Sequence, residues 1–451
     1  MDDIGFGRAM AGLLEASHRI GPGELATAVR DAARTMGLTD AVVLLADVRQ
    51  VHLAPLSPPA ADGVGAPAGP TADAATADAA TADAATADAA TAAGPVADAP
   101  THPGPRRHSD PSAVGGPVSG ALPLEGSPAG RAYRTGAVQS APADDGPGRL
   151  LWLPILDGAE RIGVLRVEVP PGGSVDLGHC LALASLVGLI VVARLPFVDD
   201  LVDTVRVVPM TLQAELAWAF MPPRTVGTRH VTSTAVLEPA YEIGGDAFDH
   251  SFSGDRLRIA VVDAMGHDLA SGGSSALAIA AGRTVRRAGG GLAEIAAVID
   301  RELDRWFPER LLTGVFAELD TSDGRLTWVN RGHPAPLLIR RQRVVPAALE
   351  RPADLPLGLA GHERTPGTVH EVRLEPGDRV LIHTDGVTEA RSATGELFGE
   401  ERLTDMIVQA TAAGEAAPEA LRRLVHALLE RQDHRLSDDA TIVLVEWHPA
   451  V

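Results

Sequence analysis

Four acidic positions in the second half of the chain each lie beside an apolar run and next to glycine or another aspartate. They occur in Gly244-Gly245-Asp246, Val261-Val262-Asp263, Thr384-Asp385-Gly386 and Asp438-Asp439-Ala440. Each pattern predicts a short strand that ends at a carboxylate. Carboxylates gathered at strand ends, without cysteine ligands, bind hard divalent ions such as Mg²⁺ or Mn²⁺. Two such ions in one site would favour a hydrolase of phosphate esters.

Composition narrows the class of protein. The chain has 451 residues, 45% of them hydrophobic, so it can form two or three domains with sizeable cores. Its net charge is -20. This acidic balance argues against a nucleic-acid binder, including a nuclease that would use the same metals. We expect no nucleic-acid partner.

Cysteine usage and hydropathy favour a soluble, cytoplasmic protein. Cys180 is the only cysteine, so neither a disulfide within the chain nor a thiolate zinc site can form. No apolar signal core follows the acidic N-terminus. The longest apolar stretch, residues 180–193, is short for a bilayer span and predicts a buried helix. We expect no membrane partner.

A change of composition marks an insertion. Residues 55–123 are rich in Pro, Gly, Ala and Thr, and they repeat Thr-Ala-Asp-Ala-Ala from Thr71. The five-residue period fits neither a helix nor a strand face, and the repeats lack the large apolar side chains that a core needs. This insertion is predicted to be disordered.

The residues on either side of the insertion predict one α+β domain. Their periodicity predicts helices over 9–20, 23–36 and 177–195 and strands over 41–45, 150–156 and 161–169. With Gly130-Arg131-Ala132-Tyr133, these elements resemble a GAF sensor domain over residues 1–196. The resemblance implies a domain that takes a small-molecule or protein signal, senses redox state, or only dimerises. Cys180 is predicted to be a core residue rather than a cofactor attachment.

A linker helix is predicted over residues 197–224. Leu212, Leu216 and Phe220 share one helical face, and Pro222-Pro223 stops the helix. This apolar stripe can pack on the catalytic domain or on a second copy of the chain, so homodimerisation stays open.

Residues 225–451 alternate strand and helix signals. Strands are predicted over 232–237, 256–262, 315–319, 326–329, 336–340, 378–383 and 441–446, and helices over 271–287, 292–306, 401–411 and 418–432. Strands that form local hairpins between helices predict an α+β fold: an α/β-β/α sandwich of two antiparallel sheets flanked by helices.

Six segments of this half, in order, resemble motifs of the bacterial SpoIIE-like branch of the metal-dependent PPM protein phosphatases. They are residues 238–249 (EPAYEIGGDAFD), 262–267 (VDAMGH), 330–336 (NRGHPAP), 355–358 (LPLG), 384–390 (TDGVTEA) and 438–441 (DDAT). All six occur at family-like spacing, so the resemblance covers the whole predicted catalytic domain.

The resemblance implies a role for each site residue. Asp263 would bridge two Mn²⁺ or Mg²⁺ ions, and the Ala264 carbonyl would help to bind one of them. Asp385 and Asp438 would hold the other ion, and Asp246 would act directly or through water. The ions would activate a water that attacks the phosphorus of phosphoserine or phosphothreonine, so no cysteine nucleophile is needed.

We therefore expect a metal-dependent protein-serine/threonine phosphatase that is regulated by its GAF-like domain. The branch implies a phosphorylated protein substrate, an anti-sigma-factor antagonist or a similar signalling protein. The alternative is a catalytically silent PPM-fold regulator that acts by binding a partner, and the intact set of predicted ligands argues against it.

Other polar residues of the motifs are assigned less active roles. The family pattern favours Asp438 over Asp439 as the ligand. Asp249 is expected to be structural, and so is His333 unless it acts as a general acid. Asp268 and Arg331 replace residues commoner in relatives, and Arg331 would be placed to meet a phosphate or an acidic partner. The sequence has no evident counterpart of the arginine that grips phosphate in eukaryotic relatives.

Overall fold

The computed structural model describes residues 3–19, 23–56, 120–143, 147–173, 175–242, 244–359, 366–392, 394–432, 436 and 438–448. The predicted disordered insertion, 55–123, falls mainly on residues 57–119, which lie outside the described residues. Its two ends are described, and there Leu122 pairs with Leu53. A strand pairing therefore falls within the predicted bounds of the insertion, at residues 122–123.

The N-terminal part is one antiparallel sheet with helices on both faces. Its elements are α1 (Asp3–Ser17), α2 (Leu25–Thr35), β1 (Asp40–Ala46), β2 (His52–Pro55), β3 (Leu122–Pro123), α3 (Pro128–Thr135), β4 (Gln139–Pro142), β5 (Arg149–Asp157), β6 (Glu160–Val169) and α4 (Leu177–Arg194). The strand order is β3-β2-β1-β6-β5-β4. Residues of α1, α2 and α4 form the core on one face, and Tyr133 of α3 packs with Trp152 on the other. This confirms the α+β prediction, while the GAF assignment stays a prediction.

The apolar helix α4 is part of the first of these cores. Over the described residues, Leu177–Phe197 is the one helical stretch long and apolar enough to cross a membrane. However, Cys180, Leu183 and Val187 on one side of it are fully buried. A core helix of this composition passes the same test, which agrees with the predicted buried helix. Burial raises the pKa of the Cys180 thiol to about 11, as expected for an unreactive core cysteine.

The linker is not one continuous helix. It contains the 3-10 turn η1 (Leu195–Phe197), α5 (Asp199–Val205) and α6 (Leu212–Phe220). The break contains Pro209, which has no backbone N–H and disfavours helix before it. The predicted apolar stripe of this linker does not pack as one surface. Leu212 is 67% exposed, whereas Phe220 packs against the cores of the C-terminal half.

The catalytic half is a four-layer sandwich. Its elements are β7 (Thr225–Gly227), β8 (Val231–Glu238), β9 (Asp246–Ser253), β10 (Arg256–Ala264), α7 (Leu269–Arg287), α8 (Leu292–Trp306), β11 (Leu312–Asp320), β12 (Arg325–Arg331), β13 (Leu337–Arg340), β14 (Arg343–Val344), β15 (His370–Arg373), β16 (Arg379–His383), α9 (Asp385–Thr388), α10 (Glu400–Ala412), α11 (Ala417–Arg431) and β17 (Ala440–Trp447). One sheet has the order β15-β12-β11-β10-β9, and the other β14-β13-β16-β17-β8-β7. Neighbouring strands are antiparallel in both.

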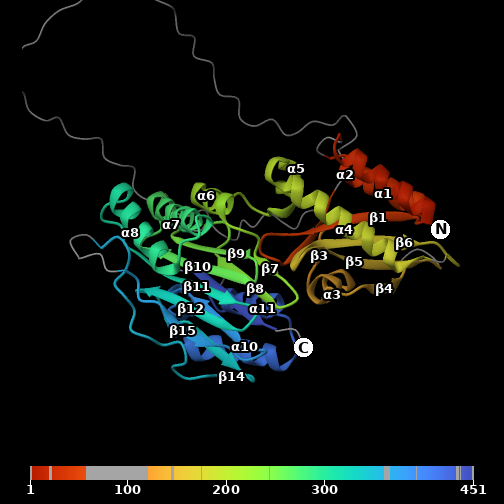
Figure 1. Cartoon of the computed structure of the whole chain (residues 1–451). Helices are drawn as coiled ribbons and strands as arrows, with labels where there is room; N and C mark the ends of the chain where they lie inside the picture. Colours follow the sequence, from red (N-terminus) through yellow and green to blue (C-terminus); the bar gives the residue numbers. More distant parts are fainter. Residues whose placement is uncertain are drawn as a thin grey trace, which may run out of the picture. The chain divides into compact units, whose positions relative to one another are not determined.

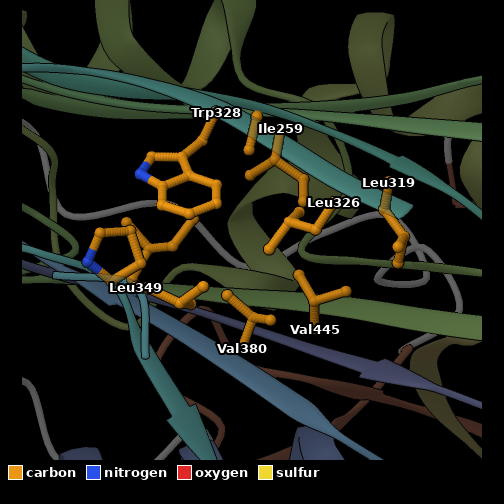
Figure 2. A pocket seen from close by; sticks show the side chains of 10 residues that line it. Ile259, Leu319, Leu326, Trp328, Leu349, Val380 and Val445 are labelled. Atoms are coloured by element: carbon orange, nitrogen blue, oxygen red, sulfur yellow. The ribbon is translucent and has the colours of Figure 1, made fainter. Parts of the chain in front are cut away.

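Apolar side chains fill the space between the two sheets. Figure 2 shows Ile259, Leu326 and Trp328 from one sheet facing Val380 and Val445 from the other. Helices α7 and α8 cover the first sheet, and α10 and α11 cover the second (Figure 1). This confirms the predicted sandwich of two antiparallel sheets flanked by helices. The space between the sheets is apolar, so the polar site residues are expected at the ends of the strands.

Candidate active site

Two of the four predicted carboxylates lie opposite each other at one end of the first sheet. Asp263 is near the end of β10, and its partner in the ladder is Asp246, the first residue of β9. The prediction that every aspartate ends a strand is therefore wrong for Asp246, and it is also wrong for Asp438, which precedes its strand. In an antiparallel pair the end of one strand lies beside the start of the other. A carboxylate that ends one strand, Asp263, therefore lies beside one that begins its neighbour, Asp246.

The second sheet contributes the other two carboxylates in the same way. Asp385 follows β16 and opens the short helix α9, whereas Asp438 precedes β17. The N–H of Thr384 donates to the Thr441 carbonyl at 3.0 Å, which joins the two segments. A Cβ on Gly386 would overlap the Asp439 carbonyl, so the close approach of these segments requires glycine at position 386.

Hydrogen bonds connect the two sheet edges. The Thr384 hydroxyl donates to Asp246 Oδ2 at 2.8 Å. Asp439 Oδ2 accepts from the backbone N–H of Gly244 at 2.7 Å and from that of Asp246 at 3.2 Å. Through these bonds Asp439 holds the Gly-Gly-Asp loop, and it is only 7% exposed, whereas Asp438 is exposed. This placement agrees with the preference for Asp438 as the ligand, which remains a prediction.

The glycines of the first motif bring its loop against Ala264. A Cβ on Gly245 would overlap the Ala264 carbonyl, and one on Gly244 would lie 2.9 Å from the His267 Cα. Only glycine permits this contact, so Gly-Gly before Asp246 brings the loop beside the proposed carbonyl ligand.

Burial and mutual repulsion change the acidity of the cluster. Burial, followed by the charges of Asp263 and Asp439, raises the pKa of Asp246 well above its ordinary value. Burial and three neighbouring carboxylates raise the pKa of Asp263 to about 7. Those neighbours are Asp385, Asp438 and Asp439. The site is thus a partly buried cluster of carboxyl groups, and a cation would relieve the repulsion between them.

The donor chemistry fits hard divalent ions. Carboxylates and a backbone carbonyl at one edge are the oxygen ligands that Mg²⁺ and Mn²⁺ prefer. Within the described residues, no three acidic, His or Cys side chains already converge as a ligand set. Asp246, Asp263, Ala264, Asp385 and Asp438 fit a metal in the kind and charge of their donors, while the coordination itself stays a proposal.

Several other candidates have structural roles. Asp249 pairs with Arg283 at 2.8 Å and with Arg286, away from the carboxylate edge. His333 is buried, and its Nδ1 lies 2.9 Å from the Thr313 hydroxyl. Both positions agree with the structural roles expected from the sequence.

Arg331 is placed differently from the sequence expectation. It is 4% exposed, and its Nε donates to the Leu355 carbonyl at 2.7 Å. It therefore supports the Leu-Pro-Leu-Gly segment instead of reaching toward a phosphate.

Sequence reasoning missed the roles of Thr384 and Asp439. Both act by hydrogen bonds to residues of the first motif, which lie well over a hundred positions earlier in the chain. The only local signal was their place directly beside a predicted ligand, which does not identify a hydrogen-bond partner.

Comparisons with known proteins agree with this architecture. Residues 253–448 match the family model described as Stage II sporulation protein E (SpoIIE). Protein IcfG of Synechocystis sp. is 30% identical over 131 residues, which cover 29% of this chain and 20% of IcfG. The chain thus matches about a fifth of the length of this curated relative.

Two solved structures match about half of the chain. The RsbU and RsbW domains of Rv1364c from Mycobacterium tuberculosis match with a TM-score of 0.43 and 24% identity, over 51% of this chain and 63% of that one. The PP2C phosphatase domain of SpoIIE from Bacillus subtilis, with a fragment of its regulatory domain, matches with a TM-score of 0.40 and 18% identity, over 49% of this chain and 64% of that one. The family match, with the motifs in family order, identifies residues 253–448 as a SpoIIE-type domain of the PPM protein phosphatases.

Proposed function

We propose that this chain is a Mn²⁺- or Mg²⁺-dependent phosphatase that hydrolyses phosphoserine or phosphothreonine in a protein. The observation that carries the proposal is the direct pairing of Asp246 with Asp263, beside Asp385 and Asp438 from the second sheet. Burial and neighbouring carboxylates raise the pKa of Asp246 and of Asp263, and a bound cation would offset this repulsion.

Each residue has a distinct task in this proposal. Asp263 would contact both ions, as the family resemblance implies, and its pairing with Asp246 and nearness to the second-sheet carboxylates support this role. Thr384 orients Asp246, and Asp439 holds the loop before it. When bound, two such ions supply hydroxide near neutral pH by lowering the pKa of water, and they neutralise charge on the phosphoryl group.

The first experiment measures hydrolysis of a phosphoserine peptide with and without Mn²⁺. Wild type should turn over only with metal, and Asp263→Asn should lose about 100-fold or more of kcat/KM, the scale set by one electrostatic group in an active site. Asp323→Asn is the matched control, because Asp323 is 41% exposed in the β11–β12 turn. A wild type that is silent with both metals would instead favour the partner-binding regulator.

The substrate class follows from the branch. We propose a phosphorylated anti-sigma-factor antagonist or a similar signalling protein, since this is the substrate that the resemblance to the SpoIIE-like branch implies. Release of phosphate from such a protein, compared with release from a short peptide of the same sequence, would measure how much of the recognition lies outside the phosphorylated residue.

The N-terminal domain is proposed to regulate this activity. Arg49, in the turn between β1 and β2, lies 4.0 Å from the Glu238 carboxylate and 5.2 Å from the centre of the Tyr241 ring. Arg422 of α11 is buried between Glu419 and Glu125, and the second of these precedes α3. The proposal is supported by the contacts of Arg49 with Glu238 and Tyr241, which belong to the segment that leads into the Gly-Gly-Asp loop.

A further inference from the structure

A guanidinium group lies beside the metal-binding motif and has no place in the function described so far. Strand β11 runs antiparallel to β10, with Leu312 opposite Ala264. The pairing continues beyond the strands, because the Met265 N–H donates to the Leu311 carbonyl at 3.1 Å. One step further, a Cβ on Gly266 would lie 3.5 Å from Arg310 Nη1. Arg310 therefore lies alongside the turn that follows Asp263 and Ala264.

The backbone under Arg310 is fixed by the Leu-Pro-Leu-Gly motif. Leu357 and Leu312 exchange backbone hydrogen bonds of 2.9 and 3.1 Å. Gly358 has a φ of +78°, and a Cβ there would overlap the Arg310 carbonyl. The Gly358 N–H donates to Asp300 at 2.7 Å, which anchors the motif on α8. The motif thus holds the backbone of Arg310 in one place, while its side chain reaches past Gly266 to Asp268 at the start of α7.

The present partner of Arg310 is weakly held. Its Nη2 lies 2.6 Å from Asp268 Oδ2, and the two side chains are 33% and 54% exposed. Ion pairs between such exposed groups contribute little to stability, so the guanidinium can leave Asp268 at small cost. A dianionic phosphoryl group is a stronger partner, because arginine binds two phosphate oxygens in a planar, bidentate geometry.

We propose that Arg310 binds the phosphoryl oxygens of the substrate, and that Asp268 holds its side chain until the substrate arrives. The inference rests on the proposed phosphatase function and extends it to substrate recognition. No counterpart of the phosphate-gripping arginine of eukaryotic relatives is evident in the sequence, and Arg310 would take that role. Asp268 would also have two separate tasks, since Oδ1 caps α7 through the Ser271 N–H at 2.8 Å while Oδ2 binds Arg310.

The test compares Arg310→Gln, Arg310→Lys and Asp268→Asn in the full chain. Inhibition by inorganic phosphate and the KM for a phosphoserine peptide are measured with Mn²⁺, and Mn²⁺ affinity is measured by calorimetry without substrate. Arg310→Gln should raise both the phosphate inhibition constant and the KM for the peptide about 10- to 100-fold, the usual effect of losing a hydrogen bond to a charged group. Arg310→Lys should recover part of this loss, and Mn²⁺ affinity should stay within two-fold.

Asp268→Asn tests the holding role. The amide oxygen can still cap α7, but the competing negative charge is gone, so phosphate should inhibit a few-fold more strongly than in wild type. Arg256→Gln is the control, because Arg256 is 49% exposed in an ion pair at the opposite end of β10. It should behave as wild type.

The outcomes separate this inference from the proposed function. Turnover by wild type with an unchanged phosphate inhibition constant in Arg310→Gln would overturn the inference and leave the phosphatase intact. A raised peptide KM with unchanged phosphate inhibition would also overturn it, since Arg310 would then bind an acidic side chain of the substrate. A wild type without turnover would refute the phosphatase, and calorimetric titration of inorganic phosphate into the Mn²⁺-loaded protein would still test Arg310.

Discussion

The Thr384 hydroxyl donates a 2.8 Å hydrogen bond to Asp246 Oδ2 and so joins the two sheets at the site. The same hydroxyl oxygen accepts from the Thr441 N–H at 2.9 Å, which fixes its orientation. One oxygen of Asp246 is therefore occupied, and the other is the one that can face a cation. Orientation of a metal ligand by a neighbouring hydrogen bond is a common way to tune metal affinity.

Replacing Thr384 should therefore weaken metal binding. Thr384→Val keeps the shape but removes the hydroxyl, and we expect Mn²⁺ affinity to fall 10- to 100-fold. Thr384→Ser keeps the hydroxyl and should stay close to wild type. Calorimetric titration of Mn²⁺ measures both. Equal affinity in the Val and Ser variants would mean that the hydroxyl does not orient the ligand.

The acidity of the carboxylate cluster predicts how stability depends on pH without metal. The pKa of Asp263 is raised to about 7, so between about pH 4 and 7 the folded protein keeps a proton that the unfolded chain has lost. The free energy of unfolding should then fall as the pH rises through this window. Urea unfolding of the metal-free protein at several pH values measures it.

Asp263→Asn is the comparison for this pH effect. An amide cannot titrate, so the variant should lose less stability between pH 4 and 7 than wild type does. Added Mn²⁺ should reverse the trend, because ligands must lose their protons to bind the ion. Parallel pH curves for wild type and Asp263→Asn would show that Asp263 titrates normally.

The close contact between Gly245 and Ala264 predicts a strict glycine requirement. Gly245→Ala places a Cβ against the Ala264 carbonyl, so we expect a loss of about 1–3 kcal/mol in the free energy of unfolding. Gly12→Ala is the control, because Gly12 lies in α1 with open space around its Cα and should gain up to about 1 kcal/mol. Denaturant unfolding measures the free energy of unfolding of both variants. A Gly245→Ala protein as stable as wild type would refute the contact.

Sequence patterns predicted the elements with strong periodicity and missed those without it. Helix α8 was predicted at its observed bounds, because its apolar residues recur at helical spacing. Strand β9 was missed, because Asp246–Ser253 contains two aspartates, a histidine and two serines despite being largely buried. Those polar residues are satisfied by partners distant in sequence, such as Arg283 for Asp249. Single-sequence periodicity cannot register such partners.

The same limit applies to the site. The ligand candidates were predicted because each lies in a short motif, but their pairing depends on register between strands. Asp439 appeared to be a spare ligand until its hydrogen bonds to Gly244 and Asp246 placed it under the loop. Arg310 belongs to none of the six motifs, and only the continuation of the β10–β11 ladder brings it beside Gly266.

The contact of Arg49 with Glu238 and Tyr241 predicts that the N-terminal domain is coupled to the carboxylate cluster. Glu238 ends β8 opposite Ala440, and Tyr241 lies three positions before Gly244. Arg49→Gln should loosen this segment and lower kcat about 3- to 10-fold, the scale of coupling energies between distant sites. Phosphopeptide hydrolysis with saturating Mn²⁺ measures the effect.

Arg30→Gln is the matched control for this coupling. Arg30 pairs with Asp40 at 3.1 Å inside the N-terminal domain, and both side chains are about as shielded as that of Arg49. The two variants therefore remove equivalent charges, but only one of them contacts the catalytic half. If kcat falls equally in both, the loss reflects general destabilisation of the N-terminal domain. If kcat falls in Arg49→Gln alone, at unchanged unfolding midpoint, the segment from Glu238 to Asp246 couples the N-terminal domain to the carboxylates.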